Sequence, residues 1–240
     1  ATTEIYSLSL HDALPIWLST GLSYTPGTFC KTEELIELNK VVSELGGFHA
    51  THMRNEAATV LESIDETIRI ARESGVKTTI SHLKIMSKQM VNKTNYLFSK
   101  IDAAVSSGID LWADQYPYDA YGSDLHYGMP KYLSGLPVDE RIAALQNETI
   151  LQQLRQLVNS GQMFSSLGIA GWQDVWPTTT GHAEWDGKSL PTLATMLGKT
   201  EFDTWVHIMI DCRFRCMAVY FAMDEDRKST RLNSSHGKLS

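Results

Sequence analysis

Apolar residues in the first half of the chain recur at helical spacing in three segments, residues 32–45, 59–73 and 96–107. In each segment the apolar positions fall on one stripe, as in a helix that packs one face against a core. A glycine follows each segment, at positions 46, 75 and 108, and glycine readily adopts the left-handed conformation that ends many helices. The pattern therefore predicts three helices, each ended by a glycine.

A short run typical of a β-strand follows each of these glycines, and the runs span residues 48–52, 77–81 and 109–114. The helix–glycine–strand unit repeats at about 30 residues, the length of one βα unit. Helices and strands that alternate at this period indicate a parallel sheet. We expect the three strands to be neighbours in chain order and to run parallel.

Two parallel architectures fit this pattern. A doubly wound sheet usually carries a G-x-G-x-x-G phosphate turn after a strand, and residues 21–27 lack that turn. A (β/α)₈ barrel instead carries its chemistry at the carboxyl ends of several strands. The polar clusters of this chain lie at those ends, in residues 52–56, 82–84 and 114–118. The sequence therefore favours an α/β fold that forms part of a TIM-like barrel.

The pattern loosens after residue 118. It predicts one or two helices over 138–160, a strand over 163–168, a tryptophan-rich loop over 171–188, a largely helical segment over 190–210 and a strand over 216–222. No linker-like run divides the chain.

Both ends of the chain resemble translated short-read sequencing adapters. Residues 1–16 match one adapter, and residues 226–236 match its partner codon by codon. We therefore leave residues 1–16 and the tail 226–240 out of the fold prediction, as is done for tags and fusion scars. Residues 17–225 remain as one partial barrel domain, which we expect to derive from an open reading frame cut at both ends.

Composition and charge exclude some classes of protein. The chain is 42% hydrophobic and 20% charged, which is typical of a folded soluble protein. Its net charge of −7 argues against a nucleic-acid partner, and no apolar run approaches the roughly 20 residues of a membrane span. Its 3 cysteines lack the spacing of a disulfide framework, so we expect a reducing compartment, the cytoplasm.

Two histidines, His52 and His82, follow equivalent strands about one βα unit apart. Neighbouring strand ends in a parallel sheet are roughly 4.8 Å apart, so two imidazoles there can reach one Zn²⁺. We expect the two rings to lie within about 5 Å of each other, given ligand bonds near 2 Å. His49 lies an odd number of residues from His52 and is therefore expected to face the helices as a structural residue.

The other polar residues at the strand ends allow more than one role. Lys84 lies on the same strand face as His82, either as a solvated lysine or as a cation for a substrate carboxylate. Arg54 and Glu56 form an ion pair that braces the loop, or Glu56 accepts a hydrogen bond that orients a histidine ring. Asp114 is a metal ligand, an orienting group or a structural cap.

Four motifs occur in the same order as in a known family: residues 18–27 (LSTGLSYTPG), 51–56 (THMRNE), 80–84 (ISHLK) and 113–118 (ADQYPY). In this they resemble the N-acyl-D-amino-acid deacylases (D-aminoacylases) of the amidohydrolase superfamily. The resemblance spans residues 17 to about 225 and is strongest up to Tyr118.

The resemblance implies a zinc-dependent amidohydrolase that cleaves the amide bond of an N-acyl-D-amino acid to a carboxylate and a D-amino acid. By motif match, His52 and His82 would be zinc ligands, Lys84 would bind the carboxylate of this small-molecule substrate, and Tyr116 would help to orient the scissile group. Zinc lowers the pKa of bound water toward 7 and polarises a carbonyl.

Other parts of the family pattern are not found in this sequence. They are an early His-x-His motif, a cysteine ligand in an Asn-Cys-Gly context and a late catalytic aspartate. We therefore expect the 240-residue chain to be inactive by itself, since the aspartate would be the general base. The alternatives are a fragment of a hydantoinase-like or dihydroorotase-like amidohydrolase, or a non-catalytic partial barrel with structural histidines.

Overall fold

The computed structural model describes residues 17–86 and 93–223. The segments predicted to derive from adapters, 1–16 and 226–240, lie outside the described residues. The described chain divides into two compact units, the first formed by residues 17–85 and 93–116 and the second by residue 86 and residues 117–223. The sequence pattern predicts one domain over 17–225 and carries no signal for this division.

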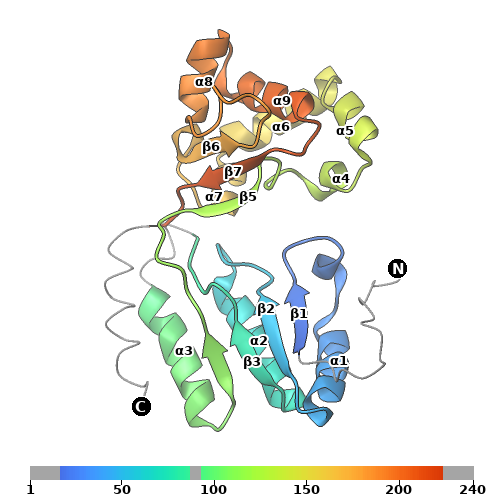
Figure 1. The fold of residues 1–240 in the computed structure, drawn as a ribbon, viewed down its shortest axis with the longest axis vertical. Helices are drawn as coiled ribbons and strands as arrows, with labels where there is room; N and C mark the ends of the chain where they lie inside the picture. The colour runs from blue at the N-terminus through green and yellow to red at the C-terminus, as the bar shows by residue number, and fades with distance from the viewer. Residues whose placement is uncertain (1–16, 87–92, 224–240) are drawn as a thin grey trace. The chain divides into compact units, whose positions relative to one another are not determined.

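The first unit is built on a four-stranded parallel sheet with the strand order β1-β2-β3-β4 (Figure 1). This confirms the prediction that three of the strands are parallel neighbours in chain order, and it adds β1 at the edge. The strands and helices of this unit are β1 (Trp17–Gly21), η1 (Gly27–Phe29), α1 (Thr32–Glu44), β2 (Phe48–His52), α2 (Val60–Ser74), β3 (Lys77–Ile80), α3 (Thr94–Ser106) and β4 (Leu111–Ala113).

The core of the first unit lies between the sheet and the helices α2 and α3. Ile64 and Ile68 of α2 pack with Leu97 of α3 and with Ile80 of β3 in one buried cluster. Each fully buried side chain of this size stabilises the fold by roughly 1.5–3 kcal/mol. The predicted ending of α2 is also observed, because Gly75 follows the helix with φ of 72° and its N–H bonds back to Ala71. The core thus fixes β2 and β3 side by side.

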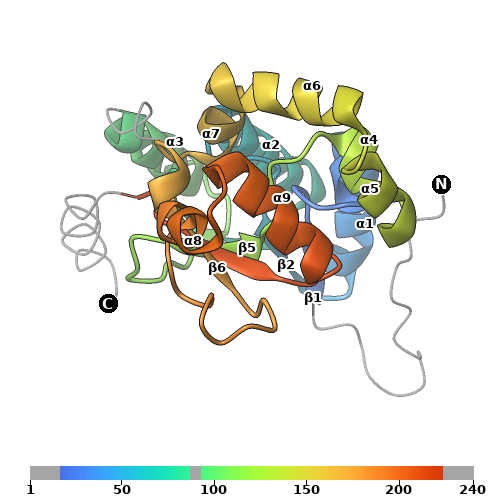
Figure 2. The same cartoon turned by 90° about the horizontal axis from the view of Figure 1, so that it is seen from above.

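The second unit holds a three-stranded antiparallel sheet in the order β5-β7-β6. Helix α8 packs beside α9 and against β6 (Figure 2). The elements of this unit are β5 (Tyr121–Asp124), α4 (Lys131–Ser134), α5 (Val138–Ala144), α6 (Glu148–Asn159), α7 (Gln162–Leu167), η3 (Trp172–Asp174), β6 (Val175–Thr178), α8 (Leu190–Leu197), α9 (Glu201–Asp211) and β7 (Met217–Tyr220).

Predictions for this second unit hold in part. The helices over 138–160 and 190–210 and the strand over 216–222 are confirmed, but the strand predicted over 163–168 is wrong because the segment forms α7. Glycines in the left-handed conformation flank this helix, and a run of six residues is too short for its periodicity to separate strand from helix. The loop predicted over 171–188 contains the strand β6, whose backbone pairs with β7.

A disulfide bond joins Cys212 and Cys216, at the turn between α9 and β7. Arg213 and Phe214 both have positive φ and reverse the chain there, which brings the two Cα atoms to 5.7 Å. The sequence analysis did not predict this bond, because four-residue spacing matches no disulfide framework. Cys30 takes no part in this bond.

None of the helices in the described part of the chain is long and apolar enough to cross a membrane.

Candidate metal centre

The carboxyl ends of β2 and β3 carry the two histidines singled out in the sequence. His52 is the last residue of β2, and His82 lies two residues beyond the end of β3. The backbone of His82 has a positive φ of 43°, and its N–H donates to a carboxylate oxygen of Asp114, beyond β4. This contact is with the backbone of His82 and not with its ring, which is the geometry of a structural cap among the alternatives for Asp114.

The two imidazole rings converge, as predicted. His52 Nδ1 and His82 Nε2 are 2.9 Å apart, and the ring centroids are 4.5 Å apart. We call these two atoms the inner nitrogens, and His52 Nε2 and His82 Nδ1 the outer nitrogens. The ring of Tyr24 lies 5.0 Å from the ring of His52, a contact that the sequence analysis did not predict.

Glu56 lies on the outer side of both rings and is 2% exposed. Its Oε1 is 3.0 Å from the outer nitrogen of His82, and its Oε2 is 3.7 Å from the outer nitrogen of His52. The ammonium of Lys84 also contacts Oε2. The proposed role of Glu56 as an acceptor for a histidine ring is therefore matched by the geometry.

The protonation states in this cluster follow from burial and from these contacts. Burial lowers the pKa of His52 to about 4, so its imidazole is neutral at pH 7. Burial alone would raise the pKa of Glu56, but the hydrogen bond with His82 and the charge of Lys84 together lower it. At neutral pH the cluster therefore holds a neutral His52 and an ionised Glu56.

Arg54 does not pair with Glu56, so that alternative is wrong. Its guanidinium forms two hydrogen bonds to the carboxylate of Glu66 on α2, at 2.8 and 2.9 Å. It also donates to the carbonyl oxygens of Thr28 and Cys30. Arg54 thus joins the loop around η1 to α2, next to the histidine cluster rather than within it.

Lys84 is buried, which differs from the solvated lysine considered in the sequence analysis. Its Nζ is 2.9 Å from the outer nitrogen of His82 and lies 5.6 Å from the ring centroid of Tyr116. The rings of Tyr116 and His82 are 6.4 Å apart. All four residues named by motif match therefore lie in the first unit, near one another.

His49 faces away from this cluster, as predicted. It is fully buried, and its Nε2 is 3.0 Å from the hydroxyl of Thr20 on the neighbouring strand. Burial lowers the pKa of His49 to about 4.

The burial of His49 predicts that the folded chain loses stability in acid. Between pH 6.5 and 4 the unfolded chain binds a proton that the folded His49 excludes. The stability from neutral His49 is therefore complete above pH 6.5 and is lost toward pH 4, by up to about 3 kcal/mol. Urea unfolding at pH 7 and pH 4.5 should show a smaller loss in His49→Gln than in the unsubstituted chain. Equal losses in the two proteins would contradict the assignment.

In the described residues, one group of histidine, cysteine and acidic side chains is close enough to hold a metal ion. It comprises His52, Glu56 and His82, whose ligand atoms lie within 4.8 Å of one another. Zinc favours neutral imidazole, the form that burial imposes on His52. Two ligands of a tetrahedral zinc lie roughly 3.3 Å apart, so a slight separation of the inner nitrogens would accommodate the ion. The residues present therefore fit zinc.

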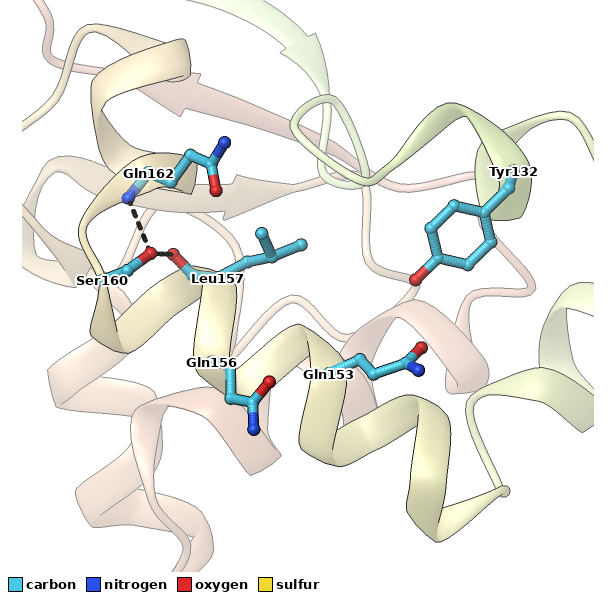
Figure 3. A pocket seen from close by; sticks show the side chains of 6 residues that line it. All are labelled: Tyr132, Gln153, Gln156, Leu157, Ser160 and Gln162. Carbon is cyan, nitrogen blue, oxygen red and sulfur yellow. Dashed lines mark hydrogen bonds between the residues drawn. The ribbon is translucent and has the colours of Figure 1, made fainter.

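A separate hollow of about 530 Å³ lies in the second unit. It is formed between α4 and α6–α7, and Figure 3 shows the side chains around it: Tyr132, Gln153, Gln156, Leu157, Ser160 and Gln162. No titratable group other than the tyrosine lines it, so it offers no acid, base or metal ligand of the kind that the histidine cluster provides.

The sequence is 30% identical over 210 residues to a D-aminoacylase of Alcaligenes xylosoxydans xylosoxydans, an alignment that covers 88% of this chain and 34% of that protein. The fold agrees with this likeness. A crystal structure of N-acyl-D-glutamate deacylase from Bordetella bronchiseptica, complexed with zinc and a phosphonate inhibitor, matches with a TM-score of 0.63 and 26% identity, over 88% of this chain and 36% of that one. The chain is therefore similar to D-aminoacylases over most of its own length.

A crystal structure of D-aminoacylase, described as defining a novel subset of amidohydrolases, matches 90% of the chain with a TM-score of 0.61 and 27% identity. The matched region makes up 36% of that D-aminoacylase structure. The chain thus spans about a third of the length of these relatives. No family model matches the sequence.

Proposed function

We propose that this chain carries part of the zinc site of an enzyme that hydrolyses N-acyl-D-amino acids to a carboxylate and a D-amino acid. The observation that carries the proposal is the convergence of His52 and His82 at the carboxyl ends of neighbouring parallel strands, in a chain that is similar to a D-aminoacylase over 88% of its length. The two alternatives of the sequence analysis, a hydantoinase-like fragment and a non-catalytic partial barrel, have no comparable support. Four consecutive parallel strands with intervening helices also support a partial TIM-like barrel.

In this proposal the inner nitrogens of His52 and His82 hold the zinc. When bound, zinc acts as a Lewis acid toward the scissile carbonyl and activates a water molecule for attack. The chain's own residues prepare the site: the strands fix the two rings, and burial keeps His52 neutral. Support for zinc comes from the zinc complex of the N-acyl-D-glutamate deacylase.

The substrate carboxylate is proposed to bind to Lys84, with Tyr116 orienting the scissile group. The ammonium of Lys84 already contacts Glu56. An ammonium carries three donors, so it can serve two carboxylates at once. The ring of Tyr116 lies beside Lys84 and His82, where a substrate held by the lysine would extend toward the metal. The absence of a nucleic-acid partner and the cytoplasmic location remain predictions.

Zinc binding by the 240-residue chain tests the metal assignment. We expect competition with a chromophoric chelator to reveal one zinc per chain, and His52→Ala and His82→Ala each to weaken binding by more than about 100-fold, because each removes a ligand. His49→Gln is the matched control, since it alters a buried histidine of the same strand, and it should leave the affinity within about threefold. Unchanged zinc affinity in His82→Ala would rule out the site.

A further inference from the structure

The ring of His82 has different neighbours at its two nitrogens. Its inner nitrogen faces His52, while its outer nitrogen lies 3.0 Å from Glu56 Oε1 and 2.9 Å from Lys84 Nζ. A neutral imidazole carries one proton, so one nitrogen donates and the other accepts. The position of that proton decides whether the inner nitrogen can bind a metal.

The contacts of Lys84 favour a proton on the outer nitrogen of His82. An ammonium can only donate, and Lys84 has two oxygen acceptors besides the ring, Glu56 Oε2 and the carbonyl oxygen of His82. An ionised carboxylate can only accept, so Glu56 Oε1 requires a donor from the ring. With the proton on the outer nitrogen, the ring donates to Glu56 Oε1, while Lys84 keeps its ion pair with Glu56 Oε2 and its hydrogen bond to the carbonyl oxygen of His82. The contact of Lys84 with the ring is then electrostatic rather than a hydrogen bond, and the inner nitrogen keeps its lone pair.

The same carboxylate also faces the other ring. Glu56 Oε2 is 3.7 Å from the outer nitrogen of His52, so each oxygen of Glu56 faces the outer nitrogen of one histidine. The inner nitrogens are 2.9 Å apart, so without metal one of them must donate a proton to the other. With the outer nitrogen of His82 protonated, His52 is the donor. A cation held by both inner nitrogens would need the proton of His52 on its outer nitrogen, which faces Glu56 Oε2.

We propose that Glu56 is a positioning residue that fixes the tautomer of His82, so that the inner nitrogen of this ring keeps the lone pair that a divalent cation needs. The contacts of the carboxylate are with the outer nitrogens, so for a cation at the inner nitrogens Glu56 acts through the histidines rather than as a ligand. This inference rests on the proposed function for the identity of the cation. The tautomer of His82 itself can be measured without any metal.

The first test measures the ring nitrogens of the metal-free 240-residue chain by ¹⁵N NMR of labelled histidine. In the unsubstituted chain, the outer nitrogen of His82 should carry the proton and the inner nitrogen should have the shift of a bare nitrogen. In Glu56→Gln this preference should be lost, because an amide can donate as well as accept. A bare outer nitrogen in the unsubstituted chain, or an unchanged ring in Glu56→Gln, would overturn the proposal.

The second test measures zinc affinity in the same proteins. Glu56→Gln should weaken zinc binding by about 10–100-fold, the usual effect of removing the partner that orients a histidine ligand. The control is Glu66→Gln, which removes a partly buried carboxylate of α2 that bonds Arg54. It should change the affinity by less than about threefold.

A further variant separates positioning from folding. Should Glu56→Gln fail to fold because Lys84 is left unpaired, Glu56→Gln/Lys84→Met removes both buried charges together. That double variant should fold and still bind zinc about 10–100-fold more weakly. Wild-type zinc affinity in the folded double variant would overturn the positioning role. A chain that binds no zinc at all, yet loses the His82 tautomer in Glu56→Gln, would refute the proposed function and support the role of Glu56.

Discussion

Replacement of His82 by alanine is expected to abolish the proposed zinc-dependent hydrolysis in a longer protein that contains residues 17–225 of this chain. The substitution removes one of the two converging imidazoles, and with it an inner nitrogen of the proposed metal site. The loss in kcat/KM should exceed the roughly 10–100-fold typical of removing a group that only orients a ligand. Release of free D-amino acid from N-acetyl-D-amino acids, with added zinc, measures it.

His49→Gln is the control in that longer protein, because its ring faces the other side of β2. It should retain activity and lose stability instead. The 240-residue chain alone should show no turnover with zinc, since general acid–base assistance usually contributes about 10²–10⁴-fold and its expected aspartate is not found in the sequence. Full activity of the His82→Ala enzyme would refute the metal assignment, and turnover by the 240-residue chain would refute the predicted inactivity.

Lys84→Met is expected to lower the free energy of unfolding by about 3–5 kcal/mol, the range for breaking a buried ion pair from one side. The exposed fractions of the Lys84 and Glu56 side chains are 5% and 1%, so the remaining carboxylate would be left buried without its cation. Urea denaturation followed by circular dichroism gives the change directly.

Lys100→Met provides the matched control, because Lys100 pairs with Asp65 at the protein surface. It should cost less than about 1 kcal/mol, as surface ion pairs do. Adding Glu56→Gln to Lys84→Met should recover part of the loss, since no buried charge then remains unpaired. A loss below about 1 kcal/mol for Lys84→Met would mean that water reaches Glu56.

The repeated half of the fold could be predicted because each of its elements has a clear period. Helix α2 has one apolar stripe and a glycine at its end, and β2 alternates so that His49 and His52 must face opposite sides. The equivalent places of His52 and His82 followed from the same repeat. Strand β1 was missed because its residues, Trp17–Gly21, are partly exposed at the sheet edge and show no clean alternation.

The ion pairs could not be predicted, because sequence distance is a poor guide to which charges meet. Arg54 and Glu56 are two residues apart, yet the helix α2 brings Glu66 to Arg54 while the turn after β2 directs Glu56 toward Lys84. The burial of Lys84 depends on that same turn. The parallel register predicted where the histidines lie, whereas their charged neighbours depend on loop geometry that no short-range pattern encodes.

The left-handed backbone of His82 lowers the stability of the fold at the position that carries a proposed metal ligand. Histidine tolerates this conformation better than most residues, but a glycine there would relieve the steric penalty, which is of order 1 kcal/mol. Selection for a more stable chain would therefore favour the loss of this imidazole, and only selection for what the imidazole does would keep it. Any stabilisation of this protein by consensus or directed evolution should hold residue 82 constant.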